Sequence, residues 1–294
     1  MQLFRYAAAA VLVALLMGCG PRSLIINGMA DGLAAQGMAD EDDLTLAREA
    51  SAFYLKLSES VLRETPAHRA LAEAVAGSFT KYAYAFVAFE AERLEARDAR
   101  GAQQLRARAA RLYDRARRHA MQALAQGNPG FADRLERASR SSGAKLALPA
   151  ADARLAYWAA AAWGAHIALS KDRPEAVADL PQVVTLASAA YAASPDLGEG
   201  ALASLMGTLE SARPGGNLAQ ARAYFNRALA ASQGRSAAVL TAMAESLAQP
   251  AGDRQAYADL LQQALAQDAA PRDLDGQVMR LRAQWLLDTI DDRF

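Results

Sequence analysis

The sequence has little of what disulfide-stapled, metal-binding or strand-rich proteins require. Among its 294 residues there is one cysteine, Cys19, and there are three histidines. A single cysteine excludes a disulfide within the chain and a metal site built from several thiolates. Runs of Val, Ile and Thr, which favour strands, are scarce. Net charge is also lacking: 32 Lys and Arg balance 32 Asp and Glu, so the chain has no general attraction to nucleic acid.

What the sequence does contain is alanine, leucine, arginine, glutamine and glutamate, the residues with the highest helix propensity. Hydrophobic residues make up 53% of the chain, enough for a sizeable buried core. No alternation of apolar and polar residues with period two persists along the chain. These features predict an all-α fold.

The N-terminus has the pattern of an export signal. Arg5 precedes an unbroken apolar stretch over residues 7–16. This stretch is shorter than the roughly 20 residues that a membrane-spanning helix needs, so we interpret it as the core of a signal peptide. Residues 16–19 read LMGC and resemble a bacterial lipobox, which implies cleavage before Cys19 and acylation of that cysteine. An ordinary cleaved signal or a short anchor, with Cys19 incidental, is the alternative.

This pattern predicts three segments. Residues 1–18 form a lipoprotein signal peptide, residues 19–39 a lipidated N-terminus and tether, and residues 40–294 a single all-helical domain. Gly20 stands where aspartate acts as an inner-membrane retention signal in other lipoproteins. We therefore expect a periplasmic protein anchored by its lipid to the inner face of the outer membrane.

The first helix of the domain is predicted after a cluster of carboxylates at residues 40–43, which can cap a helix N-terminus. Leu46, Ala50, Phe53, Leu57 and Val61 follow at the spacing of one helix face. The helix should end at residues 65–66, because the residue before a proline avoids the helical conformation. Further helices are predicted over residues 71–89, 105–124 and 155–169, with a loop over 139–145.

The spacing of later breaks indicates repeats. Breaks at residues 194–195, 232–233 and 270–271 delimit two units, each long enough for two helices. Their length is close to the period of about 34 residues of tetratricopeptide (TPR) repeats. We predict stacked helix pairs in a degenerate TPR-like superhelix, an architecture that offers a concave binding surface.

The sequence shows no set of residues for catalysis, metal binding or a cofactor. It has no HExxH, GxSxG, Walker A or GxGxxG motif. We expect His68 and His119 at the surface and His166 as a hydrogen-bonded core residue. Six arginines over residues 106–118 are interpreted as a solvated helix face, with docking of an acidic partner as the alternative.

The aromatic residues are the candidates for ligand binding. Rings surround the helix predicted over residues 71–89 and recur on the alanine-rich helix over 155–169, so a single core stripe cannot hold them all. Some of them could line an apolar pocket with a cation at its rim. The candidates are Tyr82, Tyr84, Phe86, Trp158 and Trp163, with Lys171 as the anion contact. Packing in the core is the alternative for each ring.

Three blocks of the sequence resemble the TatT family, the T components of tetratricopeptide-associated TRAP transporters. They are YWAAAAWG at 157–164 with the segment to residue 181, FTKYAYAFV at 79–87, and RAQWLL at 282–287. The resemblance implies a periplasmic lipoprotein that associates with the solute-binding protein of a TRAP transporter. It also implies an internal ligand-binding pore, possible trimers and no enzymatic activity.

Two hypotheses on function follow. In the first, the chain is an accessory subunit that docks the solute-binding protein and binds or hands over a small, partly hydrophobic ligand through the pore. In the second, it is an envelope scaffold or assembly lipoprotein with no small-molecule site. A cavity lined by Tyr82, Trp158 or Trp163 would favour the first, and rings interlocked in a dry core would favour the second. An enzyme would require a convergent cluster of histidine and carboxylates in one cleft.

Overall fold

A computed structural model describes residues 21–36, 41–141, 143, 145–267 and 274–294. Within these ranges every regular element is helical and there is no strand, which confirms the all-α class. The predicted signal peptide and Cys19 lie outside the described residues. None of the described helices is long and apolar enough to span a bilayer.

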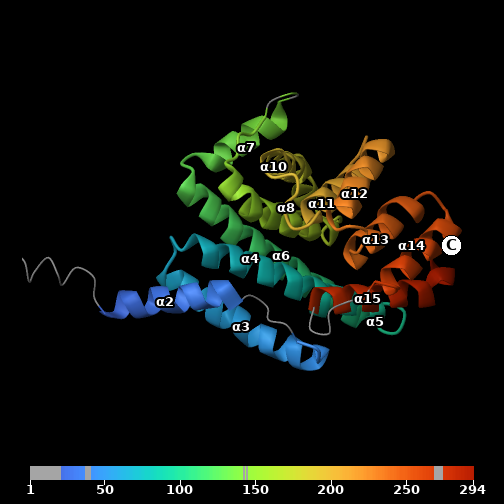
Figure 1. Cartoon of the computed structure of the whole chain (residues 1–294), viewed down its shortest axis with the longest axis horizontal. Coiled ribbons are helices and arrows are strands. Elements are labelled where there is room, and N and C mark those ends of the chain that lie inside the picture. Colours follow the sequence, from blue (N-terminus) through green and yellow to red (C-terminus); the bar gives the residue numbers. More distant parts are fainter. Residues whose placement is uncertain (1–20, 37–40, 142, 144, 268–273) are drawn as a thin grey trace, which may run out of the picture.

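The helices follow one another around a central layer formed by α4, α6 and α8 (Figure 1). In chain order the elements are α2 (Pro21–Gln36), α3 (Leu44–Glu64), α4 (Arg69–Ala83), the π-helical η1 (Tyr84–Ala88), α5 (Phe89–Leu94), α6 (Ala99–Gly127), α7 (Phe131–Arg140), the 3-10 turn η2 (Ala150–Asp152), α8 (Ala153–Ala168), α9 (Pro174–Val177), α10 (Leu180–Ala193), α11 (Ala201–Ala212), α12 (Leu218–Ala231), α13 (Ala237–Met243), the π-helical η3 (Ala244–Ala248), α14 (Arg254–Leu265), α15 (Leu274–Asp288) and the 3-10 turn η4 (Ile290–Asp292).

Helix α3 begins and ends where the sequence predicts. The Asp43 carboxylate accepts hydrogen bonds from the backbone N–H groups of Thr45 and Leu46, at 2.8 and 3.1 Å. The last helical residue is Glu64, immediately before the Thr65-Pro66 pair. The buried face of α3, however, is the one that carries Leu55 and Leu62, and much of the periodic stripe from Leu46 to Leu57 lies on the opposite side.

Helix α2 lies within the segment predicted as a tether. It packs against α3 and α4, with Ala30 and Leu33 buried. The Tyr54 hydroxyl donates a hydrogen bond to the backbone oxygen of Leu33, at 2.6 Å, and joins α2 to α3.

Most of the core belongs to one large cluster that extends from α2 to α11 and includes Leu274 and Val278 of α15. It contains Phe79, Phe131, Leu155 and Leu186, each at most 2% exposed. Two smaller clusters hold the C-terminal helices together, one around Phe225 and one around Tyr257. The C-terminal helices therefore have cores of their own beside the main one.

The two units predicted from the breaks after residue 194 are helix pairs. α11 packs on α12, and α13 with η3 packs on α14. Close approach in the first pair depends on Gly207, where a Cβ atom would lie 2.8 Å from the Phe225 ring. The pairing is confirmed, and a TPR-like superhelix stays a prediction. Helix α15 then turns back and lies beside α5, so segments 190 residues apart in the sequence meet (Figure 1).

Candidate functional site

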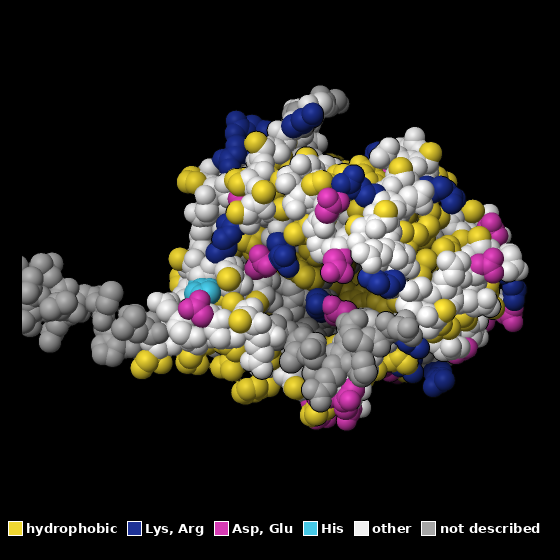
Figure 2. Space-filling model, in the orientation of Figure 1, with side chains coloured by type: hydrophobic (Ala, Val, Ile, Leu, Met, Phe, Trp, Pro, Cys, Tyr) yellow, Lys and Arg dark blue, Asp and Glu magenta, His cyan; other side chains and the backbone are white. Residues whose placement is uncertain are grey.

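An open cavity of about 490 Å³ lies between the N-terminal and C-terminal halves of the protein. One side is formed by α4, η1, α6 and α8, and the other by the turn before α11 together with α13 and α15. Figure 2 shows a hollow near the centre of one face, with hydrophobic side chains inside it and charged ones around it. The volume falls in the range of small-molecule binding sites.

The floor of the cavity is one face of α8. Arg154, Tyr157, Trp158, Ala161 and Ala165 lie at intervals of three and four residues, so they share a face, and all five line the cavity. The rings of Tyr157 and Trp158 are 4.8 Å apart. The alanines keep the space above this face open.

Trp158 has its place because a glycine lies beneath it. A Cβ atom at Gly77 of α4 would stand 2.8 Å from Cε2 of the indole ring. The missing side chain lets α4 and α8 approach with the large ring between them, and the ring forms part of the cavity wall.

Three tyrosines contribute neutral polar groups to the cavity wall, beside the charged side chains of Lys81, Arg154 and Asp275. Tyr84, Tyr113 and Tyr157 line the cavity, and no hydrogen bond within the described part of the chain involves their hydroxyl groups. Burial raises the pKa of Tyr84 and Tyr113, and burial together with the Asp275 carboxylate raises the pKa of Tyr157 to about 12. At neutral pH all three phenols are uncharged and can donate or accept a hydrogen bond with a ligand.

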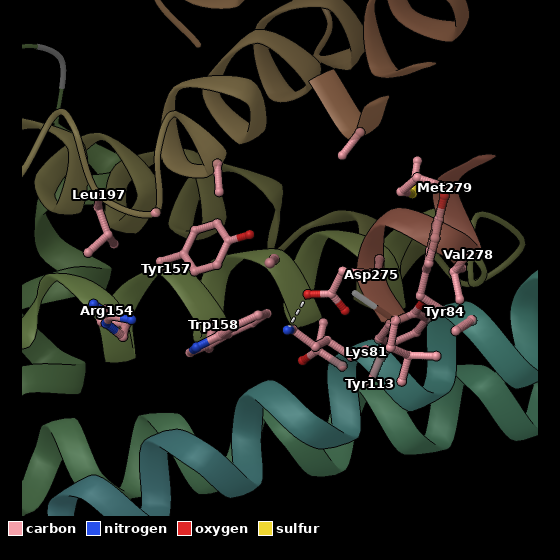
Figure 3. Close-up of a pocket in the computed structure, with 18 residues that line it drawn as sticks. Lys81, Tyr84, Tyr113, Arg154, Tyr157, Trp158, Leu197, Asp275, Val278 and Met279 are labelled. Carbon is pink, nitrogen blue, oxygen red and sulfur yellow. Dashed lines mark hydrogen bonds and ion pairs between the residues drawn. The ribbon is translucent and has the colours of Figure 1, made fainter. Parts of the chain in front are cut away.

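Helix α15 closes the cavity from the C-terminal side. Leu274, Val278 and Met279 contribute apolar surface, and Asp275 forms an ion pair with Lys81 of α4 (Figure 3). The Lys81 ammonium also lies 6.0 Å from the centre of the Trp158 ring. The ion pair places two opposite charges in the cavity wall and holds α15 against α4.

A second, more polar cavity of about 460 Å³ adjoins the first. The two share six lining residues, among them Tyr157, Asp275 and Met279. The second cavity adds the side chains of Ser232, Arg235, Ser236 and Arg280. Together they form a groove with an aromatic half and a hydroxyl- and guanidinium-bearing half.

Residues predicted to bind a ligand divide between this cavity and the core. Tyr84 and Trp158 line the cavity. Tyr82, Phe86 and Trp163 are buried, at 5%, 8% and 4% exposure, and are not among the lining residues.

Trp163 is held in the core by specific contacts. Its indole N–H donates to the Asp179 carboxylate at 3.2 Å, and the Arg117 guanidinium lies 4.9 Å from its ring. Lys171 is exposed in the turn after α8, away from the lining residues.

The predicted set omits six lining residues with functional groups: Thr80, Lys81, Tyr113, Arg154, Tyr157 and Asp275. A signal for two of them exists in the sequence. Lys81 precedes Tyr84 by three residues, so the two share a helix face, and Tyr157 belongs to the α8 stripe described above. Tyr113 and Asp275 come from distant helices, and local spacing cannot place them there.

The histidines have structural partners. Nδ1 of His166 lies 2.9 Å from the backbone oxygen of Ala110, which confirms the predicted hydrogen bond. His119 is not the surface residue that was expected, because its ring is largely covered and lies 2.9 Å from the buried carboxylate of Glu59. His68 is also largely covered, and its ring accepts a hydrogen bond from the N–H of Leu71 at the start of α4. Among the described residues, no group of three or more His, Cys, Asp or Glu side chains could hold a metal ion.

Arg282 of α15 joins the two halves behind the cavity. It is 6% exposed, and its guanidinium donates to Glu92 at 3.0 Å and to Glu245 at 2.6 and 3.1 Å. The same group lies 5.6 Å from the ring of Tyr84, a lining residue. Tyr84 begins η1 and Glu245 lies in η3, so both π-helical segments meet at this arginine. Such segments are frequent at functional sites.

Comparison with known proteins agrees with this architecture. Residues 40–294 match the family described as TRAP transporter T-component. The chain belongs to this family. Its members are accessory components of a transport system rather than enzymes. The chain is also similar to an uncharacterized protein of Treponema pallidum (strain Nichols), with 26% identity over 263 residues that cover 87% of this chain and 81% of the relative.

Proposed function

We propose that this T-component is a lipid-anchored periplasmic subunit that docks the solute-binding protein of a TRAP transporter and holds a small, partly hydrophobic ligand. The observation that carries the ligand-binding part is the open cavity lined by Tyr84, Tyr113, Tyr157 and Trp158. Membership of the T-component family supports the association with a TRAP transporter.

The chemistry of the groove favours an amphipathic ligand. Apolar side chains and ring faces line the first cavity, and the tyrosine hydroxyls offer neutral hydrogen-bonding groups. The adjoining cavity presents the guanidinium groups of Arg235 and Arg280, which suit an anionic or strongly polar head group. A ligand with an apolar body and such a head group would use both halves, and a continuous pore would allow it to pass to the partner.

The lipid anchor is assigned to Cys19, with the signal peptide over residues 1–18 and the acylated protein on the inner face of the outer membrane. The lipobox-like LMGC sequence and Gly20 support this assignment. The domain over residues 40–294 would then be held within the periplasm, where a solute-binding protein diffuses. Assembly as a homotrimer is part of the same proposal.

Docking is tested by retention of the partner. The full chain, purified in detergent and immobilised, is presented with the solute-binding protein of a TRAP transporter from the same organism. We expect saturable retention at micromolar concentration, and a solute-binding protein from an unrelated transporter serves as the control. Absence of retention would remove the docking role.

Ligand binding is tested by filling the cavity. Ala161 lines it, whereas Ala168 on the same helix is exposed to solvent. We expect Ala161→Phe to weaken binding of the fluorescent amphiphile anilinonaphthalene sulfonate at least tenfold and to remove co-purified organic molecules detected by mass spectrometry, while Ala168→Phe leaves both unchanged. Equal binding by the two variants would favour the scaffold function without a small-molecule site.

A further inference from the structure

Helices α2 and α3 expose more large apolar side chains than their packing explains. Ile25 and Met29 of α2 are 65% and 45% exposed, and Leu46 and Phe53 of α3 are 51% and 71% exposed. These four are half of the eight large hydrophobic side chains that the described residues leave exposed. Concentration on two adjacent helices distinguishes them from the single exposed apolar residues that are normal on protein surfaces.

The exposed side chains form stripes rather than scattered points. Leu46, Ala50 and Phe53 share one face of α3, and Ile25 and Met29 lie one turn apart on α2. The other side of each helix packs into the core, so both helices are apolar on two sides. Apolar side chains gather along the edge of the molecule over α2 and α3 (Figure 2).

The rim of this surface is not strongly charged. Asp31 is the one charged residue of α2 between residues 25 and 36, and its carboxylate lies 3.0 Å from His68. The exposed side of α3 carries Lys56 and Arg63, at 58% and 61% side-chain exposure, together with the exposed Arg48, Glu49 and Glu64, so its net charge is small. An apolar face bordered by charged side chains is the pattern of amphipathic helices that lie in a membrane interface.

The chain geometry indicates what covers this surface. α2 begins at Pro21, two residues after Cys19. Two residues span at most about 7 Å, so whatever holds Cys19 also holds the start of α2. Ile25 is the fifth residue of that helix, so its side chain lies close to the membrane that holds Cys19.

We propose that the exposed apolar face of α2 and α3, marked by Ile25, Met29, Leu46 and Phe53, rests in the headgroup region of the membrane to which the protein is anchored. This inference rests on the acylation of Cys19 put forward under Proposed function. The two or more acyl chains of a lipobox cysteine hold a protein to the bilayer but leave its orientation free. The apolar face supplies a second contact with the bilayer and fixes the orientation.

The orientation has a functional use. α2 and α3 lie on one side of the molecule, and α10 to α12 lie on the opposite side (Figure 1). With the first pair on the membrane, the latter helices point into the periplasm, where a protein partner can reach them.

The lone cysteine makes a direct test possible. Once Cys19 is acylated, Phe53→Cys provides the one free thiol of the chain, which can carry an environment-sensitive nitrobenzoxadiazole label. The acylated full chain is reconstituted in vesicles of phosphatidylethanolamine and phosphatidylglycerol that contain a spin-labelled lipid. Leu218→Cys on α12, with a similarly exposed parent residue at 54%, is the matched control.

We expect the label at position 53 to shift to the blue and to be quenched at least twofold more by the spin-labelled lipid than the label at 218. Leu46→Cys should behave like Phe53→Cys. Agreement between the two positions would show that the result does not depend on one particular substitution. Because both parent side chains are exposed, neither substitution opens the core.

The remaining outcomes overturn the proposal in distinguishable ways. Vesicle flotation of the chain with equal quenching at 53 and 218 leaves the anchor in place and removes the membrane-facing surface. Failure to float removes the anchor and this inference together. Disulfide-linked dimers of unlabelled Phe53→Cys, without quenching of the labelled protein, would assign the surface to a second copy of the chain.

Discussion

Gly77 and Gly207 both lie against an aromatic ring with no room for a methyl group. A Cβ atom at either position would come within 2.8 Å of the ring, that of Trp158 in one case and of Phe225 in the other. The surroundings differ, because Phe225 is fully buried whereas Trp158 faces an open cavity into which it can move. We expect Gly207→Ala to lower the free energy of unfolding by about 2 kcal/mol through overpacking.

Gly77→Ala should cost less, because the Trp158 ring can shift, whereas the gain in helix propensity of up to about 1 kcal/mol is common to both substitutions. Urea denaturation midpoints of the two variants measure the difference. In Gly77→Ala the shifted ring should change the fluorescence of Trp158 and weaken ligand binding in the cavity. An equal loss of stability in both variants would show that the cavity wall at Trp158 is as rigid as the core.

Glu59 is a buried carboxylate with a low pKa. Burial by itself raises the pKa, but hydrogen bonds from Arg115, Lys56 and His119 outweigh it and lower the pKa from 4.5 to about 2. A carboxylate whose pKa is lower in the folded than in the unfolded state stabilises the protein above pH 4.5 and loses this contribution as the pH falls toward 2.

We therefore expect Glu59→Gln to reduce the free energy of unfolding by about 2 kcal/mol at pH 7, because it weakens the hydrogen bonds of a buried carboxylate with the partly exposed Arg115 and Lys56. The difference from the unsubstituted protein should shrink between pH 4.5 and 2. Urea unfolding of both proteins across this range measures it. A difference that does not depend on pH would assign the loss to packing rather than charge.

At the scale of the helical element, Arg282 decides how α15 is attached. Methionine at this position would leave Glu92 and Glu245 facing each other without a cation. Removing one partner of a buried ion pair costs about 3 kcal/mol or more, whereas an exposed pair contributes about 1 kcal/mol or less. Arg254, which pairs with Asp291 at the surface, is the matched control.

We expect Arg282→Met to lower the free energy of unfolding by about 3 kcal/mol and Arg254→Met to change it little. Hydrogen exchange should become faster in α15 and in η1 for the first variant alone, since both segments depend on the same guanidinium. If exchange in η1 is unchanged, the arginine does not couple the two halves.

The sequence predicts the helices well and their faces less well. The boundaries of α3 follow from its capping aspartate and the proline after it, and the alanine-rich helix at residues 155–169 corresponds to α8. These boundaries depend on local contacts. By contrast, the stripe from Leu46 to Phe53 has ideal helical spacing and is nevertheless exposed, because α3 also carries a second apolar stripe that faces the core.

The candidate site shows the same division. Tyr84 and Trp158 were identified because rings recur on two helices, but nothing local separates them from Tyr82 and Trp163, which pack in the core. The missing information is the position of α15, whose Asp275 meets Lys81 across 194 residues of sequence. Spacing within one helix gives the shared face, and only the packing of distant helices shows whether that face meets a cavity.

At the scale of the whole molecule, the protein has one large core and smaller C-terminal ones. α4, α6 and α8 share the large cluster, whereas the buried residues of α14 belong to a cluster of far fewer members. Segments with fewer buried contacts open at lower free energy. We expect backbone amides of α14 to exchange through openings about 2 kcal/mol less costly than those of α6.

Native-state hydrogen exchange at increasing urea concentration measures both values. A ligand that contacts both sides of the cavity should reduce the difference between these two free energies, because its binding stabilises the closed form of the protein by mass action. Exchange at one common free energy without ligand would instead show a single cooperative unit.

Because Asp275 of α15 pairs with Lys81 of α4, the cavity is completed only after α15 has been synthesised. The floor and aromatic wall of the cavity come from residues 80–165, but the closing surface comes from α15, near the end of the sequence. A nascent chain that has emerged as far as α14 can fold its large core and still present an unfinished groove. If the cavity holds the ligand proposed above, binding requires α15, and a chain that stops before this helix would fold in part without completing the site.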